Sequence, residues 1–131
     1  MRDWTIPGSN KTDTVLFAES GLNHDEAVRH ALSFDCVIVS GNDETVGLGG
    51  HIQGGTYGPL SSTFGLAADN VYRVRVVTSD DKILVADAAQ NQDLLRAIRG
   101  WPSNLKLNDD ASQVTPIGSR AHSSPALLND L

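Results

Sequence analysis

The clearest pattern along the chain is a period of two between residues 71 and 78. One face of this stretch carries Tyr72, Val74, Val76 and Thr78, and the other carries Arg73 and Arg75. Such alternation is typical of a strand that is buried on one side. A polar turn at residues 79–82 leads into the apolar residues 83–86, so the sequence predicts a β-hairpin.

Helical spacing begins after Asn23. Glu26 follows three residues later, which is the spacing of a reciprocal capping box, and apolar residues then recur at helical intervals. This pattern predicts a short helix over about residues 24–33. Residues 36–39 are apolar on both faces and are followed by turn-forming residues, which predicts a buried strand.

The two ends of the chain show no sustained period. Residues 1–21 and 101–131 mix apolar residues with Ser, Asn, Asp, Gly and Pro, so both segments are expected to be irregular, and the second to contribute little to packing. Before this tail, a second helix is expected from a cap at Asn91 or Asp93, ending before Gly100.

Composition narrows the class of protein. The chain has 131 residues, enough for one domain or a piece of one, and carries 10 Lys and Arg against 16 Asp and Glu, a formal charge of −6. Without a basic run, nucleic-acid binding is not expected. Cys36 is the single cysteine, which excludes an internal disulfide. We expect no membrane span and find no signal-peptide pattern, so the compartment stays unknown.

Glycines cluster in the middle of the chain. Eight of the 12 lie in residues 41–65, and no charged residue occurs between Glu44 and Asp69. Backbone N–H groups in glycine-rich segments form concave sites for anions, so this segment is expected to bind a phosphorylated ligand. A surface loop is the alternative. The segment lacks the lysine of a P-loop, and Pro59 with the polar residues 61–63 predicts no helix directly after the glycines.

Several spaced motifs carry a more specific signal. They are Val46-Gly47-Leu48-Gly49-Gly50-His51 with Gly54-Gly55, Tyr57-Gly58-Pro59-Leu60-Ser61-Ser62, Phe64-Gly65-Leu66-Ala67-Ala68-Asp69-Asn70-Val71, Val76-Val77-Thr78, and residues 91–100. In this order the chain resembles the FAD-linked oxidases of the berberine-bridge-enzyme and vanillyl-alcohol-oxidase type, whose FAD-binding domain is named after p-cresol methylhydroxylase. Fungal members are the most similar.

The resemblance implies an α+β fold. It assigns residues 36–100 to part of the second of two subdomains of an FAD-binding domain. Residues 1–35 are then an N-terminal segment with one short helix, and residues 101–131 a divergent, poorly ordered tail. The implied partner is FAD, whereas protein partners are unknown.

In this family the glycine segment follows the FAD diphosphate and ribityl chain. The resemblance implies cofactor contacts at Thr45, Val46, Gly47, Gly49, Gly50, Gly54, Gly55, Gly58, Asn70 and Val71. Asp69 has an alternative structural role, capping the turn into the strand that follows. No catalytic residue and no metal ligand is implied.

Attachment of FAD is expected to be non-covalent. Family members often link FAD through a histidine in an Arg-x-Gly-Gly-His motif. That motif lies upstream in the family and has no counterpart here, because the residues after His51 match a later glycine-rich motif. His51 is therefore expected to pack beside the cofactor loop. Members with a second link carry a cysteine in Cys-Pro-Thr-Val, where this chain has Asp43. His24 and His30 fall on the first predicted helix, where surface or capping roles are expected.

Three parts of the family pattern are missing: the upstream histidyl subdomain, the glycine-rich strand after Gly100, and the substrate domain. The chain is therefore expected to be an FAD-binding fragment of an oxidoreductase that transfers a hydride from an alcohol, amine or sugar to flavin, with oxygen as acceptor. Alone it is expected to be inactive and only marginally stable. The alternative is a truncated remnant or interaction module that binds no flavin.

Overall fold

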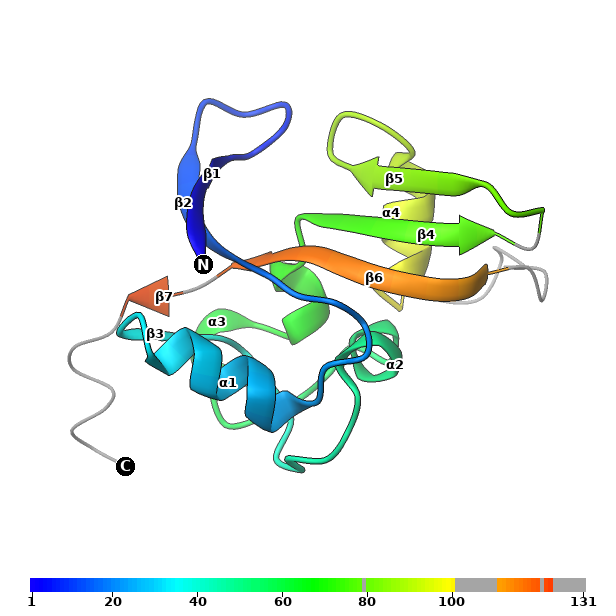
Figure 1. The fold of residues 1–131 in the computed structure, drawn as a ribbon. Helices are drawn as coiled ribbons and strands as arrows, with labels where there is room; N and C mark the ends of the chain where they lie inside the picture. Colours follow the sequence, from blue (N-terminus) through cyan, green and yellow to red (C-terminus); the bar gives the residue numbers. More distant parts are fainter. Residues whose placement is uncertain (79, 101–110, 121, 124–131) are drawn as a thin grey trace.

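A five-stranded antiparallel sheet and a two-stranded ribbon form the framework of the computed structural model, which describes residues 1–78, 80–100, 111–120 and 122–123 (Figure 1). In chain order the elements are β1 (Arg2–Thr5), β2 (Thr12–Phe17), α1 (His24–Leu32), β3 (Cys36–Val37), α2 (Leu48–Gln53), α3 (Ser61–Phe64), the 3-10 helix η1 (Ala67–Asn70), β4 (Arg73–Thr78), β5 (Ile83–Asp87), α4 (Gln92–Ile98), β6 (Ala111–Arg120) and β7 (His122–Ser123). The strand orders are β1–β2–β6–β4–β5 and β3–β7. This mixture of helices and strands confirms the α+β class.

The centre of the large sheet is β6, which lies between β2 and β4. It pairs antiparallel with β4, where Val74 is opposite Pro116 and Val76 is opposite Val114. The expectation that the tail adds little to packing is therefore wrong for residues 111–120. Backbone pairing on both edges holds this strand in place, and that pairing needs no alternating side-chain pattern. The rest of the tail, residues 101–110, 121 and 124–131, lies outside the described residues.

The N-terminal segment is also more regular than predicted. β1 and β2 form a hairpin, and the stretch Pro7-Gly8-Ser9-Asn10 is its connection, closed by a 2.9 Å bond from Ile6 N–H to the Lys11 carbonyl. Aromatic contacts fix the hairpin, since the ring of Trp4 meets that of Phe17 edge-on at 6.2 Å. Such cross-strand contacts between side chains stabilise short strands whose own pattern is weak.

Elements with strong local patterns are confirmed. α1 has the predicted capping box, in which the Asn23 side chain accepts from Glu26 N–H at 2.9 Å and the Glu26 carboxylate accepts from Asn23 N–H at 3.0 Å. The hairpin of β4 and β5 is also present. Val74 and Val76 are fully buried and Arg75 is exposed, as the alternation predicts.

The predicted strand at residues 36–39 is shorter than expected. β3 contains residues 36 and 37, which pair with β7, while Ile38 and Val39 continue as buried chain outside the named strands. They lie in the core without a ladder partner in the described part. In Figure 1, α4 lies behind β4 and β5, and α1, α2 and α3 gather below β6. The apolar core between these elements is built mainly from aliphatic side chains, including Leu16, Val71 and Ile98.

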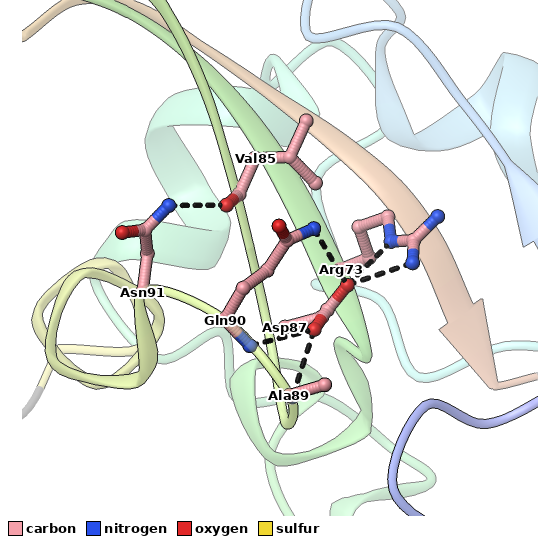
Figure 2. A network of polar contacts seen from close by, with 6 residues as sticks. All are labelled: Arg73, Val85, Asp87, Ala89, Gln90 and Asn91. Atoms are coloured by element: carbon pink, nitrogen blue, oxygen red, sulfur yellow. Dashed lines mark hydrogen bonds and ion pairs between the residues drawn. The ribbon is translucent and has the colours of Figure 1, made fainter.

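The turn after β5 is organised by one buried carboxylate, that of Asp87, which is 1% exposed (Figure 2). It accepts hydrogen bonds from the N–H groups of Ala89 and Gln90 and from the guanidinium of Arg73 on β4. Asn91 follows in a left-handed conformation with φ of 49°, and its side chain donates to the Val85 carbonyl at 2.7 Å. Asn91 thus occupies the N-cap position of α4, one of the two predicted positions, but its side chain makes no capping hydrogen bond.

Candidate functional site

The glycine segment contains the short helix α2, so it is not simply the surface loop that the sequence left as the alternative. Leu48 N–H donates to the Leu22 carbonyl at 2.8 Å, and Gly49 N–H donates to the Ser20 carbonyl at 3.4 Å. Gly58 N–H donates to the Ser61 hydroxyl at 3.0 Å. These donors are used inside the chain, because a buried N–H without a partner is costly. A second helix, α3, also follows the glycines, although none was expected.

One face of α2 carries no side chain beyond glycine. Gly50 lies within α2, and Gly47 and Gly54 flank it as its N-cap and C-cap; their spacing of i, i+3 and i+7 places all three on the same side, and all three are exposed. A Cβ built at Gly47 or Gly50 meets nothing within 4 Å. Leu48 and Ile52 lie on the opposite, buried face. We call the surface formed by Gly47, Gly50 and Gly54 the glycine face.

Other glycines of the segment serve close packing. A Cβ at Gly58 would lie 1.8 Å from the carbonyl oxygen of Ser40, and one at Gly49 would lie 2.7 Å from Cβ of Ser20. Gly55 has a φ of 96°, which side chains rarely tolerate. These three positions therefore have a structural reason to be glycine whether or not a ligand binds.

The remaining predicted contact residues differ in their surroundings. Thr45 is exposed and donates from its N–H and its hydroxyl to the Asp43 carboxylate, while the Val46 carbonyl accepts from His24 N–H. Asn70 is 5% exposed and donates to the carbonyls of Phe64 and Leu66, and the side chain of Val71 is fully buried.

Asp69 has a structural role at a turn, which the sequence analysis gave as the alternative to cofactor contact. Its carboxylate accepts from the N–H of Leu66 at 3.2 Å, which closes the first turn of η1. The structure therefore brings together the exposed glycines of α2, with Thr45 before them, and places Asn70 and Val71 inside the fold.

A histidine pair beside α2 was not foreseen. The Nε2 atom of His24 on α1 lies 2.5 Å from Nδ1 of His51 on α2, with the rings at 81°. His24 is 2% exposed, so the expected surface or capping role is wrong for it, whereas His30 is exposed as expected. Two histidines separated by 27 residues show no spacing that predicts contact.

Charge at this pair follows from its burial. The pKa of His24 is lowered from its usual value, because burial disfavours the imidazolium and His51 repels a second positive charge, whereas the Asp43 carboxylate acts in the opposite direction. Gly41 is the third partner, since its N–H donates to Nδ1 of His24 at 3.3 Å and a Cβ there would lie 2.4 Å from Cε1 of His51.

In the described residues no group of three His, Cys, Asp or Glu side chains could hold a metal ion. The same residues include no helix of the length and apolarity that a bilayer span requires.

Comparison with known proteins gives a consistent result. The family model described as "FAD binding domain" matches residues 6–87. A curated relative, "FAD-linked oxidoreductase orf1" of Neocamarosporium betae, is 46% identical over 82 residues, which cover 62% of this chain and 14% of the relative. The chain therefore spans about one seventh of the length of this relative.

Solved structures agree with the sequence comparison. The VAO-type flavoprotein MtVAO615 from Myceliophthora thermophila C1 matches with a TM-score of 0.75 and 33% identity over 93% of this chain and 21% of that one. BBE-like 1 from Physcomitrella patens matches with a TM-score of 0.71 and 28% identity over 84% of this chain and 25% of that one.

Proposed function

Because this chain belongs to the FAD binding domain family of the VAO-type and berberine-bridge-like FAD-linked oxidoreductases, we propose that it contributes part of the FAD site of such an enzyme through the glycine face of α2. The observation that carries the proposal is the exposed strip at Gly47, Gly50 and Gly54. An extended cofactor can lie directly on helix backbone where no side chain intervenes.

The residues around this strip fit an anionic cofactor. No Asp or Glu occurs between Glu44 and Asp69, so no carboxylate of the segment repels a diphosphate at short range. The exposed Thr45 lies just before α2, and its hydroxyl would have to exchange the Asp43 carboxylate for the cofactor in order to donate to it. Gly49, Gly55, Gly58, Asn70 and Val71 act indirectly in this proposal, by shaping the segment that presents the face.

FAD, when bound, supplies a flavin ring that accepts a hydride from the substrate. The substrate class we propose for the whole enzyme is an alcohol, amine or sugar, with oxygen as the acceptor. This chain binds and orients the cofactor, and we expect no turnover from it alone. Substrate positioning belongs in this proposal to parts of the protein that the chain does not include.

The test is a change that blocks the glycine face without disturbing the fold. Gly50→Leu is expected to weaken FAD binding at least tenfold, about 1.4 kcal/mol, because the side chain projects from the face into the space the cofactor needs. Titration with FAD, followed by flavin fluorescence quenching, measures the dissociation constant. Gly21→Leu is the matched control, since Gly21 is exposed, has nothing within 4 Å of a built Cβ and lies off this face.

Equal affinities for the wild type, Gly50→Leu and Gly21→Leu proteins would remove the glycine face from the cofactor site. A purified wild-type chain that stays colourless after addition of FAD and gel filtration would favour the remnant or interaction module instead. Both outcomes are read from the protein without any substrate.

A second expectation concerns attachment. Bound FAD should be released by acid precipitation and recovered in the supernatant, because Asp43 offers no thiol and its carboxylate is held by Thr45. Nδ1 of His51 is engaged by His24. The absorbance of the redissolved pellet near the flavin maximum is the measurement. Flavin that stays with the pellet would reopen a covalent link through His51.

A further inference from the structure

The contact between His24 and His51 joins the helix α1 to the helix that carries the glycine face. His51 precedes Gly54 by three residues and follows Gly47 by four, so it borders this face while its ring reaches back toward α1. The loop at Gly41 completes the cluster from a third segment. Three parts of the chain therefore meet at two imidazole rings.

The hydrogen bonds fix which ring nitrogen carries the proton. A neutral imidazole has one donor and one acceptor nitrogen. Gly41 N–H can only donate, so Nδ1 of His24 is the acceptor and Nε2 of His24 holds the hydrogen. That hydrogen is directed to Nδ1 of His51, which makes Nδ1 of His51 an acceptor and leaves its hydrogen on Nε2.

This arrangement has no site for an additional proton. Protonating Nδ1 of His24 removes the bond from Gly41, and protonating Nδ1 of His51 removes the bond from His24. Each event breaks one of the two hydrogen bonds that the imidazole rings make, while the backbone bonds from Leu48 to Leu22 and from His24 to Val46 remain.

We propose that His24 is a positioning residue for the FAD site: it fixes the orientation and tautomer of His51, holds α2 so that its glycine face is presented, and releases this hold when the pair is protonated. The inference rests on the proposed FAD site for its consequence, whereas the histidine geometry stands without it. His24 touches neither the glycine face nor a reacting atom in this scheme and acts through His51.

Burial and the charged groups that face the pair together set the direction of the pH effect. His51 on α2 and Asp43 on the loop after β3 act on His24 in opposite senses, and burial is the larger influence, so the pKa of His24 lies below that in the unfolded chain. The stabilisation from neutral His24 is therefore complete above the unfolded pKa of about 6.5 and is lost as the pH falls through the folded pKa. Affinity for FAD is expected to fall in the same direction.

Substitutions at His24 separate positioning from simple packing. His24→Ala should weaken FAD binding about tenfold at pH 7.5, by freeing the ring of His51. His24→Gln should restore affinity to within about twofold of wild type, because a glutamine oxygen can accept from Gly41 while its amide donates to His51. In wild type the dissociation constant should rise as the pH falls below the unfolded pKa of about 6.5, and by less in His24→Gln.

His30→Gln is the matched control, because His30 lies on the same helix with its side chain exposed. It should keep both the affinity and the pH dependence of the wild type. A folded His24→Ala chain that binds FAD with wild-type affinity would overturn the positioning role, as would a His24→Gln chain with the full wild-type pH dependence.

Nitrogen-15 NMR of the imidazoles in the wild-type chain, recorded without FAD at pH 7.5, tests the geometry directly. Hydrogens on Nε2 of both His24 and His51 support the proposal, and a hydrogen on Nδ1 of either ring overturns it. If the wild-type chain binds no FAD, the proposed function fails and the positioning role fails with it. The tautomers then still decide whether the pair links α1 to α2.

Discussion

Replacing Gly58 with alanine is expected to prevent stable folding of the chain. The new Cβ would lie 1.8 Å from the carbonyl oxygen of Ser40 and 3.4 Å from Cα of Gly41, and both are backbone atoms that cannot rotate away. Overpacking in a core commonly costs about 1–3 kcal/mol, and a contact this short against backbone belongs at or above the upper end. Urea unfolding followed by circular dichroism measures the loss.

The control for this prediction is Gly50→Ala, on the exposed side of α2. Nothing lies within 4 Å of a Cβ at Gly50, and alanine favours a helix by about 0.5–1 kcal/mol over glycine. This variant should be as stable as wild type or slightly more so. If Gly58→Ala unfolds at the same urea concentration as Gly50→Ala, the crossing of residues 40–41 over Gly58 is not as tight as described.

Removing the carboxylate of Asp87 is the second substitution with a large expected effect. Asp87→Ala takes the acceptor from two backbone N–H groups, the Gln90 amide and both donors of Arg73 (Figure 2). Hydrogen bonds to a charged group contribute about 1.5–3 kcal/mol each, and several are lost together here, although Arg73 keeps 29% of its side chain exposed and can be solvated. Domains have about 5–15 kcal/mol in total, so much of the population should be unfolded at 37 °C. Thermal unfolding at pH 7 is the measurement.

Acid should act on the wild-type chain through the same group. Burial on its own would raise the pKa of Asp87, but the hydrogen bonds from Ala89, Arg73 and Gln90 together hold it below its usual value. The stabilisation is therefore present above the unfolded pKa of about 3.9 and is lost as the pH falls through the lower folded pKa.

Asp80→Ala, at the exposed end of the same hairpin, is the control for Asp87→Ala and should change the melting temperature little. An equally small change for Asp87→Ala would contradict the role given to this carboxylate.

Local patterns in the sequence were sufficient for some elements. The cap at Asn23 and the alternation through Val74 and Val76 depend on residues a few positions apart, and the structure confirms α1 and the β4–β5 hairpin. β6 could not be found in this way, because its position depends on pairing with strands remote in sequence. The N-terminal hairpin likewise depends on contacts of Trp4 with Phe17 and with Tyr72.

The candidate site shows the same division. Family motifs located the glycine segment, but the sequence alone does not distinguish Gly50 from Gly58. Gly50 is exposed, whereas the backbone of Ser40 occupies the space that a side chain at Gly58 would need. That distinction depends on the segment at Ser40, which packs against Gly58 and not against Gly50. The partnership of His24 with His51 arises from the same crossing of segments, which neither residue's neighbours in sequence reveal.

The central position of β6 bears on the order in which the molecule can assemble. β1 with β2, and β4 with β5, are hairpins between neighbouring strands, but they join one sheet only through a strand made after both. A chain leaving the ribosome therefore completes its two hairpins early and holds their inner edges, β2 and β4, without a neighbour until residues 111–120 emerge. Pairings between remote segments slow folding toward the millisecond-to-second range, and unpaired strand edges recruit other chains during the wait. The yield of folded protein in a cell should thus depend on chaperones that cover those edges while synthesis finishes.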